Sequence, residues 1–255
     1  MSSDVPIPPA PAAPKFCRQC GTPWMPDWAD CPHCAKRVEL LVIPDEGRPI
    51  GSALALYFCW LGLSTIAAFW AIAGGDELTV DVAQSIAASV LVLCWCIPAR
   101  GQLMPALRRV PHVKWFGLAF IGAFATFAAA SGALRALQWL CDLREIRYTD
   151  VYFDAGYGWA LSILLVCVQP AIFEELAFRG VIFSSLRRIL NARETVLVSA
   201  LMFMILHLAV PSFVHLFLIG LILGWMRHRT GSLYPGMVLH FTHNLLCVLA
   251  ERSIT

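Results

Sequence analysis

The amino-acid sequence predicts an all-α polytopic membrane protein with about seven transmembrane helices, preceded by a small zinc-ribbon module. Three observations lead to this fold class. Of the 255 residues, 58% are hydrophobic and only 14% are charged, against about 25% charged residues in an ordinary soluble domain. Long apolar runs fill the chain from residue 52 onwards, and two closely spaced cysteine pairs lie near its start. The net charge of +2 gives no reason to expect a nucleic-acid partner.

The N-terminal part divides into three segments by composition. Residues 1–14 are rich in Pro, Ala and Ser and lack helical or strand periodicity, so they are predicted to form a disordered arm. They contain no basic stretch followed by an apolar core, which argues against a cleavable signal peptide. Residues 15–36 hold the cysteine pairs, and residues 37–51 are predicted to link them to a transmembrane domain at 52–255.

The two Cys-x-x-Cys pairs are Cys17 with Cys20 and Cys31 with Cys34. Four thiolates can complete a tetrahedral Zn²⁺ site with no open position, so the ion would be structural and would stabilise a very small module. A pair of disulfides is the alternative, which a cytoplasmic location would disfavour because thiols stay reduced there. The segment resembles the minimal zinc-ribbon domains of many bacterial membrane proteins, which implies a docking or sensing module with an unknown partner.

The apolar runs define seven predicted helices. The fourth is long for a single span, and Gln169-Pro170 is predicted to bend it because proline removes a backbone hydrogen bond. The spans are residues 52–73, 80–98, 114–139, 157–189, 193–208, 212–227 and 232–250.

Basic residues in the loops predict the orientation. The loops after the second, fourth and sixth spans contain several Arg and Lys residues, whereas the loops 74–79 and 209–211 contain neither. Excess Arg and Lys mark the cytoplasmic side of a membrane. The N-terminus is therefore predicted to lie in the cytoplasm and the C-terminus outside. The loop after the third span carries both signs of charge and does not decide the matter.

Polar residues recur within three of the apolar helices. A charge at the bilayer centre costs about 2.5 kcal/mol or more, so such residues are candidates for function. Counted at 1.5 Å per residue from the nearest cytoplasmic basic residue, four of them lie about 16–22 Å along their helices. This common level predicts a reaction centre inside the membrane. The patterns are Glu174-Glu175-x-x-x-Arg179, Phe203-x-x-x-His207 and His240-x-x-x-Asn244.

The first pattern separates the roles of its two carboxylates. Adjacent residues on a helix diverge by about 100°, so Glu174 and Glu175 cannot face the same point. Glu175 and Arg179 are an i,i+4 pair that can form a bridge along the helix. Glu174 is then the freer carboxylate, and it suits a general base that takes a proton from water. His207 can orient that water or share its proton.

The third pattern offers two groups on one helical face, His240 and Asn244. Both can donate a hydrogen bond to an oxyanion that forms on a peptide carbonyl. The glutamate and histidine residues could instead hold a divalent metal, because Glu and His are ligands of catalytic zinc. The sequence leaves both types of chemistry open.

In their order along the chain, the three motifs resemble the CAAX prenyl protease type II family, also called the CPBP or ABI intramembrane proteases. The resemblance covers about residues 155–250 and implies a four-helix catalytic core that hydrolyses a peptide bond in a membrane cavity. It implies that Glu174 activates water with the help of His207. It also implies that His240 and Asn244 stabilise the oxyanion, and that the second glutamate and the arginine of the first motif shape the site.

The resulting hypothesis is an intramembrane endopeptidase, glutamic or metallo in type, whose substrate is a membrane peptide or protein with or without a lipid anchor. The zinc ribbon is an addition to the family core, which suggests a bacterial or archaeal member in the cytoplasmic membrane. The alternative is a non-catalytic binding or immunity protein that uses the same polar cavity. A transporter is disfavoured, because the sequence shows no internal repeat.

Overall fold

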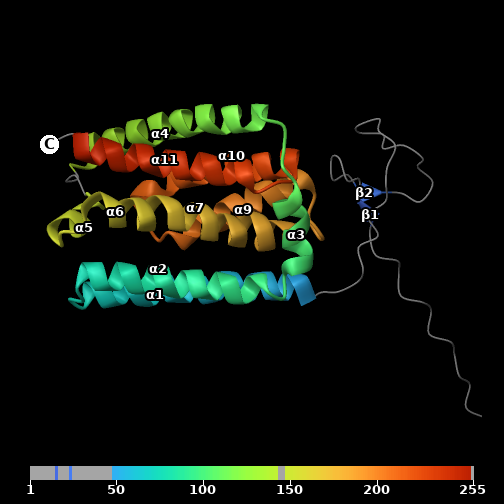
Figure 1. Ribbon diagram of the computed structural model, residues 1–255, viewed down its shortest axis with the longest axis horizontal. Helices are drawn as coiled ribbons and strands as arrows, with labels where there is room; N and C mark the ends of the chain where they lie inside the picture. Colours follow the sequence, from blue (N-terminus) through green and yellow to red (C-terminus); the bar gives the residue numbers. More distant parts are fainter. Residues whose placement is uncertain (1–14, 17–22, 25–47, 143–146, 254–255) are drawn as a thin grey trace, which may run out of the picture.

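The computed structural model describes residues 15–16, 23–24, 48–142 and 147–253, and these build a helical bundle in three tiers (Figure 1). Four sequence predictions concern residues outside this described part. They are the arm at 1–14, the four zinc-ribbon cysteines, most of the linker at 37–51 and the last two residues of the transmembrane domain.

A short antiparallel hairpin precedes the bundle in the chain. Strand β1 (Lys15–Phe16) pairs with strand β2 (Pro23–Trp24), with Lys15 opposite Trp24 and Phe16 opposite Pro23. The two strands therefore flank residues 17–22, which contain the first cysteine pair in the sequence.

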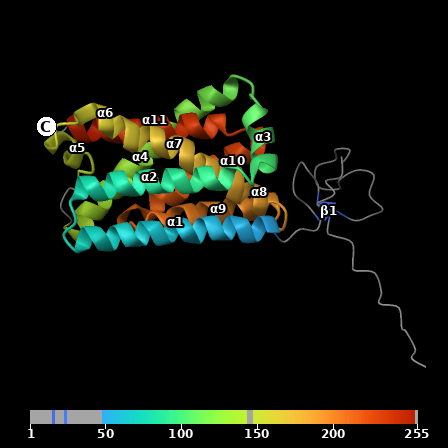
Figure 2. The same cartoon turned by 60° about the horizontal axis from the view of Figure 1, so that its bottom comes forward.

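The first tier is a pair of long helices, α1 (Arg48–Ile72) and α2 (Glu77–Cys96), which run side by side in both orientations (Figures 1 and 2). Asp76 begins α2, because its side chain accepts a hydrogen bond from the Thr79 N–H. Both helices are α-helical throughout, as expected for uninterrupted apolar sequences.

Helix α3 (Arg100–Arg108) crosses one end of the bundle and leads to the third tier (Figure 1). This tier contains α4 (Lys114–Cys141), α10 (Phe213–Thr230) and α11 (Tyr234–Ser253), and α4 packs against both of the others. Helix α10 ends at Gly231, whose φ of +67° is the left-handed conformation that glycine adopts readily at a helix C-terminus.

The middle tier contains one continuous but irregular helix, Gly158–Leu186, which contacts both outer tiers. Two of its turns are π-helical, and such turns are frequent at functional sites. The prediction that Pro170 distorts this helix agrees with a π-helical turn that ends at Val168. After α5 (Asp150–Asp154), its segments are α6 (Gly158–Ser162), η1 (Ile163–Val168), α7 (Gln169–Glu174), η2 (Glu175–Ile182) and α8 (Phe183–Leu186).

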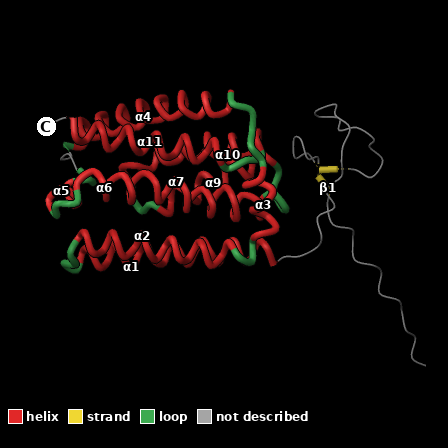
Figure 3. Tube along the Cα trace, in the orientation of Figure 1, coloured by secondary structure: helices red, strands yellow, loops and turns green. Residues whose placement is uncertain are grey.

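Helix α9 (Ala192–Leu206) completes the middle tier and is short. It starts with a capping box in which Asn191 and Glu194 exchange side-chain and backbone hydrogen bonds. Its 15 residues extend about 22 Å, less than the roughly 30 Å of a hydrocarbon core. The turn that follows, with the 3₁₀ segment η3 (Val210–Ser212), therefore lies within the length of the bundle (Figure 3).

The all-α membrane fold class is confirmed, and every predicted span overlaps a helix. Among the described residues, five helices are long and apolar enough to cross a membrane by length and composition, against about seven predicted spans. Helix α9 is too short, and α11 carries the polar residues of the third motif. The five are Ile50–Ile72, Glu77–Cys96, Lys114–Cys141, Gly158–Leu186 and Val210–Thr230.

Candidate active site

Three of the predicted site residues converge from three separate helices. Glu174 ends α7, His207 follows the last residue of α9, and His240 lies in α11. The Glu174 Oε2 atom is 3.9 Å from Nε2 of His207 and 3.9 Å from Nε2 of His240. These separations exceed a direct hydrogen bond, but a small polar group such as water can bridge them. Oε2 of Glu174 is buried and has no hydrogen-bond partner within the described protein.

Glu175 and Arg179 lie behind this group, and both are almost fully buried. The predicted i,i+4 bridge is present, with Arg179 Nη1 donating to Glu175 Oε1 at 3.0 Å. The same carboxylate oxygen is 3.2 Å from Nδ1 of His240, and Arg179 Nη2 donates to the Gly220 carbonyl at 3.3 Å. Because a carboxylate can accept a hydrogen bond from Nδ1–H, Glu175 orients the His240 ring with Nε2 toward Glu174.

Phe203 packs against both imidazoles and against the guanidinium. Its ring centroid is 4.7 Å from that of His207 and 5.9 Å from that of His240, and Arg179 Cζ lies 4.5 Å from it. The Phe203 carbonyl oxygen is 2.8 Å from Nδ1 of His207. A carbonyl can only accept, so Nδ1 of His207 is the donor, and in the tautomer with this hydrogen alone Nε2 keeps a lone pair that faces Glu174.

Asn244 lies one helical turn beyond His240, and its Nδ2 donates a 2.7 Å hydrogen bond to the carbonyl of Val166. Pro170 follows in the next turn of the irregular helix. It has no N–H to give to the residue four positions earlier, which is Val166. The amide of Asn244 therefore docks α11 on the irregular helix, and the structure places it on the backbone rather than on Glu174.

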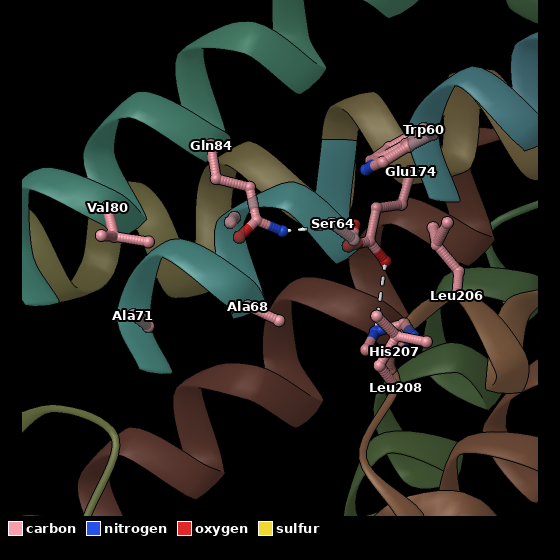
Figure 4. A pocket seen from close by; sticks show the side chains of 11 residues that line it. Trp60, Ser64, Ala68, Ala71, Val80, Gln84, Glu174, Leu206, His207 and Leu208 are labelled. Carbon is pink, nitrogen blue, oxygen red and sulfur yellow. Dashed lines mark hydrogen bonds and ion pairs between the residues drawn. The ribbon is translucent and has the colours of Figure 1, made fainter. Parts of the chain in front are cut away.

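A cavity of about 290 Å³ borders Glu174 and His207 (Figure 4). The side chains of Glu174 and His207 are 14% and 28% exposed, whereas that of His240 is 5% exposed. The side chains of Glu174 and His207 thus reach the cavity, whereas Oε2 of Glu174 and the His240 ring are buried behind its surface. The lining residues are Trp60, Ser64, Ala67, Ala68, Ala71, Val80, Gln84, Glu174, Leu206, His207 and Leu208.

Leu208 adopts an unusual backbone conformation in this lining, with a φ of +51°. The left-handed region costs an ordinary L-residue about 1–2 kcal/mol, and such outliers cluster at functional sites. Non-helical backbone at membrane depth is tolerated where it is buried in protein or lines a water-filled cavity. The turn after α9 meets that condition, because His207 and Leu208 both line the cavity.

The distances between the carboxylate and imidazole atoms can be set beside those of a zinc site. Ligands of a tetrahedral zinc lie about 2.0–2.1 Å from the ion and so about 3.3 Å from one another. The carboxylate and imidazole atoms here are 3.9 Å apart. Over the described residues, no group of three or more His, Cys, Asp or Glu side chains is placed to hold a metal. The 3.9 Å separations lie between the zinc value of about 3.3 Å and the roughly 4.6 Å between two atoms that share one tetrahedral water.

Comparison with known proteins agrees with the motifs. Residues 156–246 match the family model described as type II CAAX prenyl endopeptidase Rce1-like. This segment of the chain is Rce1-like. The match spans all three motifs, so the predicted resemblance is confirmed over the segment that contains them. No curated protein and no solved structure matches the chain. Helices α1 and α2, which form the opposite wall of the cavity, lie outside the Rce1-like segment.

Sequence reasoning did not identify the residues of that opposite wall. Ser64 and Gln84 are polar residues within otherwise apolar spans, and this was a usable signal. Leu208 gave no signal, because nothing in its residue type indicates a left-handed conformation.

Proposed function

We propose that the chain is an intramembrane endopeptidase that hydrolyses a peptide bond of a membrane-associated peptide or protein. The Rce1-like match supports protease activity of this type. The single observation that carries the mechanism is the convergence of Glu174, His207 and His240 beside a cavity. A carboxylate without a hydrogen-bond partner and two ring nitrogens surround one point at which a water can bind.

In the proposed reaction, Glu174 takes a proton from this water while the water oxygen attacks the substrate carbonyl carbon. The lone pair of His207 accepts the other water hydrogen and so orients the nucleophile. The carbonyl double bond opens to a tetrahedral oxyanion. When it re-forms, the C–N bond breaks, and Glu174 returns its proton to the leaving nitrogen.

His240 and Asn244 are the proposed oxyanion donors. His240 can donate from Nε2 when that nitrogen carries a hydrogen, and Glu175 Oε1, 3.2 Å from Nδ1, holds the ring in place. Asn244 uses one N–H for Val166 and keeps a second one for the oxyanion. Preorganised donors of this kind stabilise the charge that develops in the transition state.

The test uses a quenched fluorescent peptide that ends in a prenylated cysteine and three further residues, with purified protein in liposomes. Glu174→Gln and His207→Ala are each expected to lower kcat by about 100-fold or more. Glu77→Gln makes the same chemical change at an exposed position at the start of α2 and serves as the control. Full activity of well-folded Glu174→Gln protein would refute the mechanism.

A non-catalytic binding or immunity protein is the second candidate, and the largely apolar cavity wall favours it. Such a protein would hold a peptide beside Glu174 without cleaving it. Binding of the probe peptide by wild-type protein, with no product detected by mass spectrometry, would support this function instead.

We also propose that the N-terminus lies in the cytoplasm of a bacterial or archaeal cell and the C-terminus outside. Arg100 and Arg108 lie in α3 at one end of the bundle (Figure 1), and the basic end of α10 at Arg227–Arg229 belongs to the same predicted side. Protease protection of an N-terminal tag in inverted and right-side-out vesicles tests this orientation.

For the N-terminal segment we propose a zinc ribbon with one structural Zn²⁺ held by the four cysteines and a partner still to be found. The hairpin of β1 and β2 supports it, because the strands flank the first cysteine pair. Cys17→Ser with Cys20→Ser should remove one Zn²⁺ per chain by elemental analysis. Metal that remains in this variant would point to a second site in the membrane domain.

A further inference from the structure

The cavity beside Glu174 has two walls of different origin. One wall carries motif residues and belongs to the Rce1-like segment, whereas the other is built by α1 and α2 outside it (Figure 4). Resting on the proposed function, we infer that the α1–α2 wall binds the substrate. It selects an extended, apolar segment with small side chains next to the scissile bond.

The first reason is access to the reacting groups. Glu174 and His207 expose 14% and 28% of their side chains, and both line this cavity. Glu175 and Arg179 are 0% and 1% exposed. A peptide that reaches Glu174 through the cavity therefore lies against α1 and α2.

The second reason is the shape of the cavity. Its α1 wall runs from Trp60 to Ala71, which is about 16 Å of helix. An extended chain rises about 3.3 Å per residue, so about five residues match this length. An α-helix with side chains is about 10–12 Å wide and would need on the order of 1,000 Å³ over the same length. The cavity has about 290 Å³, which is too little for a helix, so the narrower extended form is the one that we assign to the bound segment.

The third reason is the chemistry of the wall. The wall is largely built of apolar residues and the cavity that it borders has only about 290 Å³, which favours small apolar substrate side chains. Two residues depart from this pattern, Ser64 and Gln84, and Gln84 Nε2 donates to Ser64 Oγ at 3.3 Å. The apolar members of the wall are Trp60, Ala67, Ala68, Ala71 and Val80.

Gln84 offers hydrogen-bond partners to an extended backbone at this depth. Backbone N–H and C=O groups of an extended segment have no partners within the segment, and hydrocarbon offers none. The Gln84 amide uses one N–H for Ser64 and has a second N–H and a carbonyl oxygen left. We assign Gln84 as the residue that binds the substrate backbone.

The first experiment compares two prenylated probe peptides that differ only in the three residues after the cysteine, small in one and bulky in the other. Ala68→Leu is expected to lower kcat/KM for the bulky peptide at least about tenfold more than for the small one. Ala55→Leu makes the same change at an exposed site of α1 outside the cavity wall and is the matched control. Equal losses for both peptides would overturn the assigned selectivity.

The second experiment distinguishes substrate binding by Gln84 from the hydrogen bond that links α1 and α2. Gln84→Ala and Ser64→Ala both remove the hydrogen bond between α1 and α2. Gln84→Ala is expected to raise KM at least about fivefold with kcat little changed, and Ser64→Ala to raise it less. An equal rise of KM in both variants would show that the effect comes from the hydrogen bond between α1 and α2 and not from a contact of Gln84 with substrate.

A third measurement distinguishes this inference from the proposed function. A photo-crosslinking residue replaces Ala68, or Ala55 as control, in the Glu174→Gln protein, and the probe peptide is added. Crosslinking at Ala68 and not at Ala55 supports peptide binding at the α1–α2 wall. This holds even if the wild-type protein cleaves nothing and the protease assignment fails. Cleavage by wild-type protein without any crosslink at Ala68 would refute substrate binding by the α1–α2 wall but not the protease activity.

Discussion

Helix α1 and the helix at Gly158–Leu186 are equally apolar and both long enough to span a membrane, yet they are built differently. Helix α1 is regular from end to end. The other alternates twice between α and π turns and carries a buried ion pair and Glu174. Hydropathy measures only the free energy of contact with lipid, so it gives both the same description. The candidate catalytic carboxylate lies on the irregular helix, where the sequence places charged residues that a membrane span does not require.

The largest expected effect on stability concerns the buried ion pair of the irregular helix at Gly158–Leu186. Removal of one partner of a buried ion pair costs about 3–5 kcal/mol, because the other charge is left unpaired. Arg179→Met should therefore strongly lower the thermal midpoint of the protein in detergent, whereas Glu77→Gln in the regular half should not. The double change Glu175→Gln with Arg179→Met should recover part of the loss. A midpoint for Arg179→Met within a degree of wild type would contradict this contrast.

The next effect compares two helical glycines. A Cβ on Gly236 would lie 2.7 Å from Oε2 of Glu175, whereas one on Gly62 of α1 would meet nothing within 4 Å. Gly236→Ala should destabilise by about 1–3 kcal/mol through overpacking and should displace the carboxylate that orients His240. Gly62→Ala should stabilise slightly, by about 0.5–1 kcal/mol, because alanine is the better helix former. Equal midpoints in thermal unfolding would show that the two environments do not differ as described.

A smaller effect concerns the link between Pro170 and Asn244. Asn244→Ala leaves the part-buried Val166 carbonyl without this partner, at a cost of about 1–3 kcal/mol. With Pro170→Ala, residue 170 has an N–H for that carbonyl, so the same Asn244→Ala change should cost at least about 1 kcal/mol less. A double-mutant cycle on unfolding measures the difference. Strict additivity would mean that Pro170 is not the reason the carbonyl is free.

The smallest effect on stability is expected at Leu208. Glycine adopts its φ of +51° without strain, but it also gains freedom in the unfolded chain. Leu208→Gly should therefore change the free energy of unfolding by less than about 1 kcal/mol. Activity on the probe peptide should still fall, because the turn that holds His207 becomes less rigid. An unaltered kcat would show that the strained turn has no part in positioning His207.

Much of the regular half could be predicted from the sequence. The limits of α1, α2 and α4 lie within a few residues of the predicted spans, since apolar length and loop composition determine them. In the site, the convergence of Glu174, His207 and His240 followed from counting residues along helices, and so did the Glu175–Arg179 bridge.

The rest depends on tertiary contacts that no local pattern encodes. Helix α9 was expected to cross the membrane, but it ends at Leu206 and leaves His207 in a turn. Asn244 was expected to face an oxyanion, and the sequence did not indicate that one N–H of its amide also bonds the Val166 carbonyl on another helix. Ser64 and Gln84 gain their significance only because α1 and α2 fold against the motif helices.

The burial of Arg179 has a consequence for the biogenesis of the protein. Its guanidinium reaches partners on two segments, Glu175 on its own helix and the Gly220 carbonyl on α10, which is synthesised later. While only the earlier helices have left the ribosome, half of this coordination does not yet exist. Nascent chains that stop before Gly220 should therefore hold the Glu174 helix less firmly in the bilayer and be degraded faster than the finished protein.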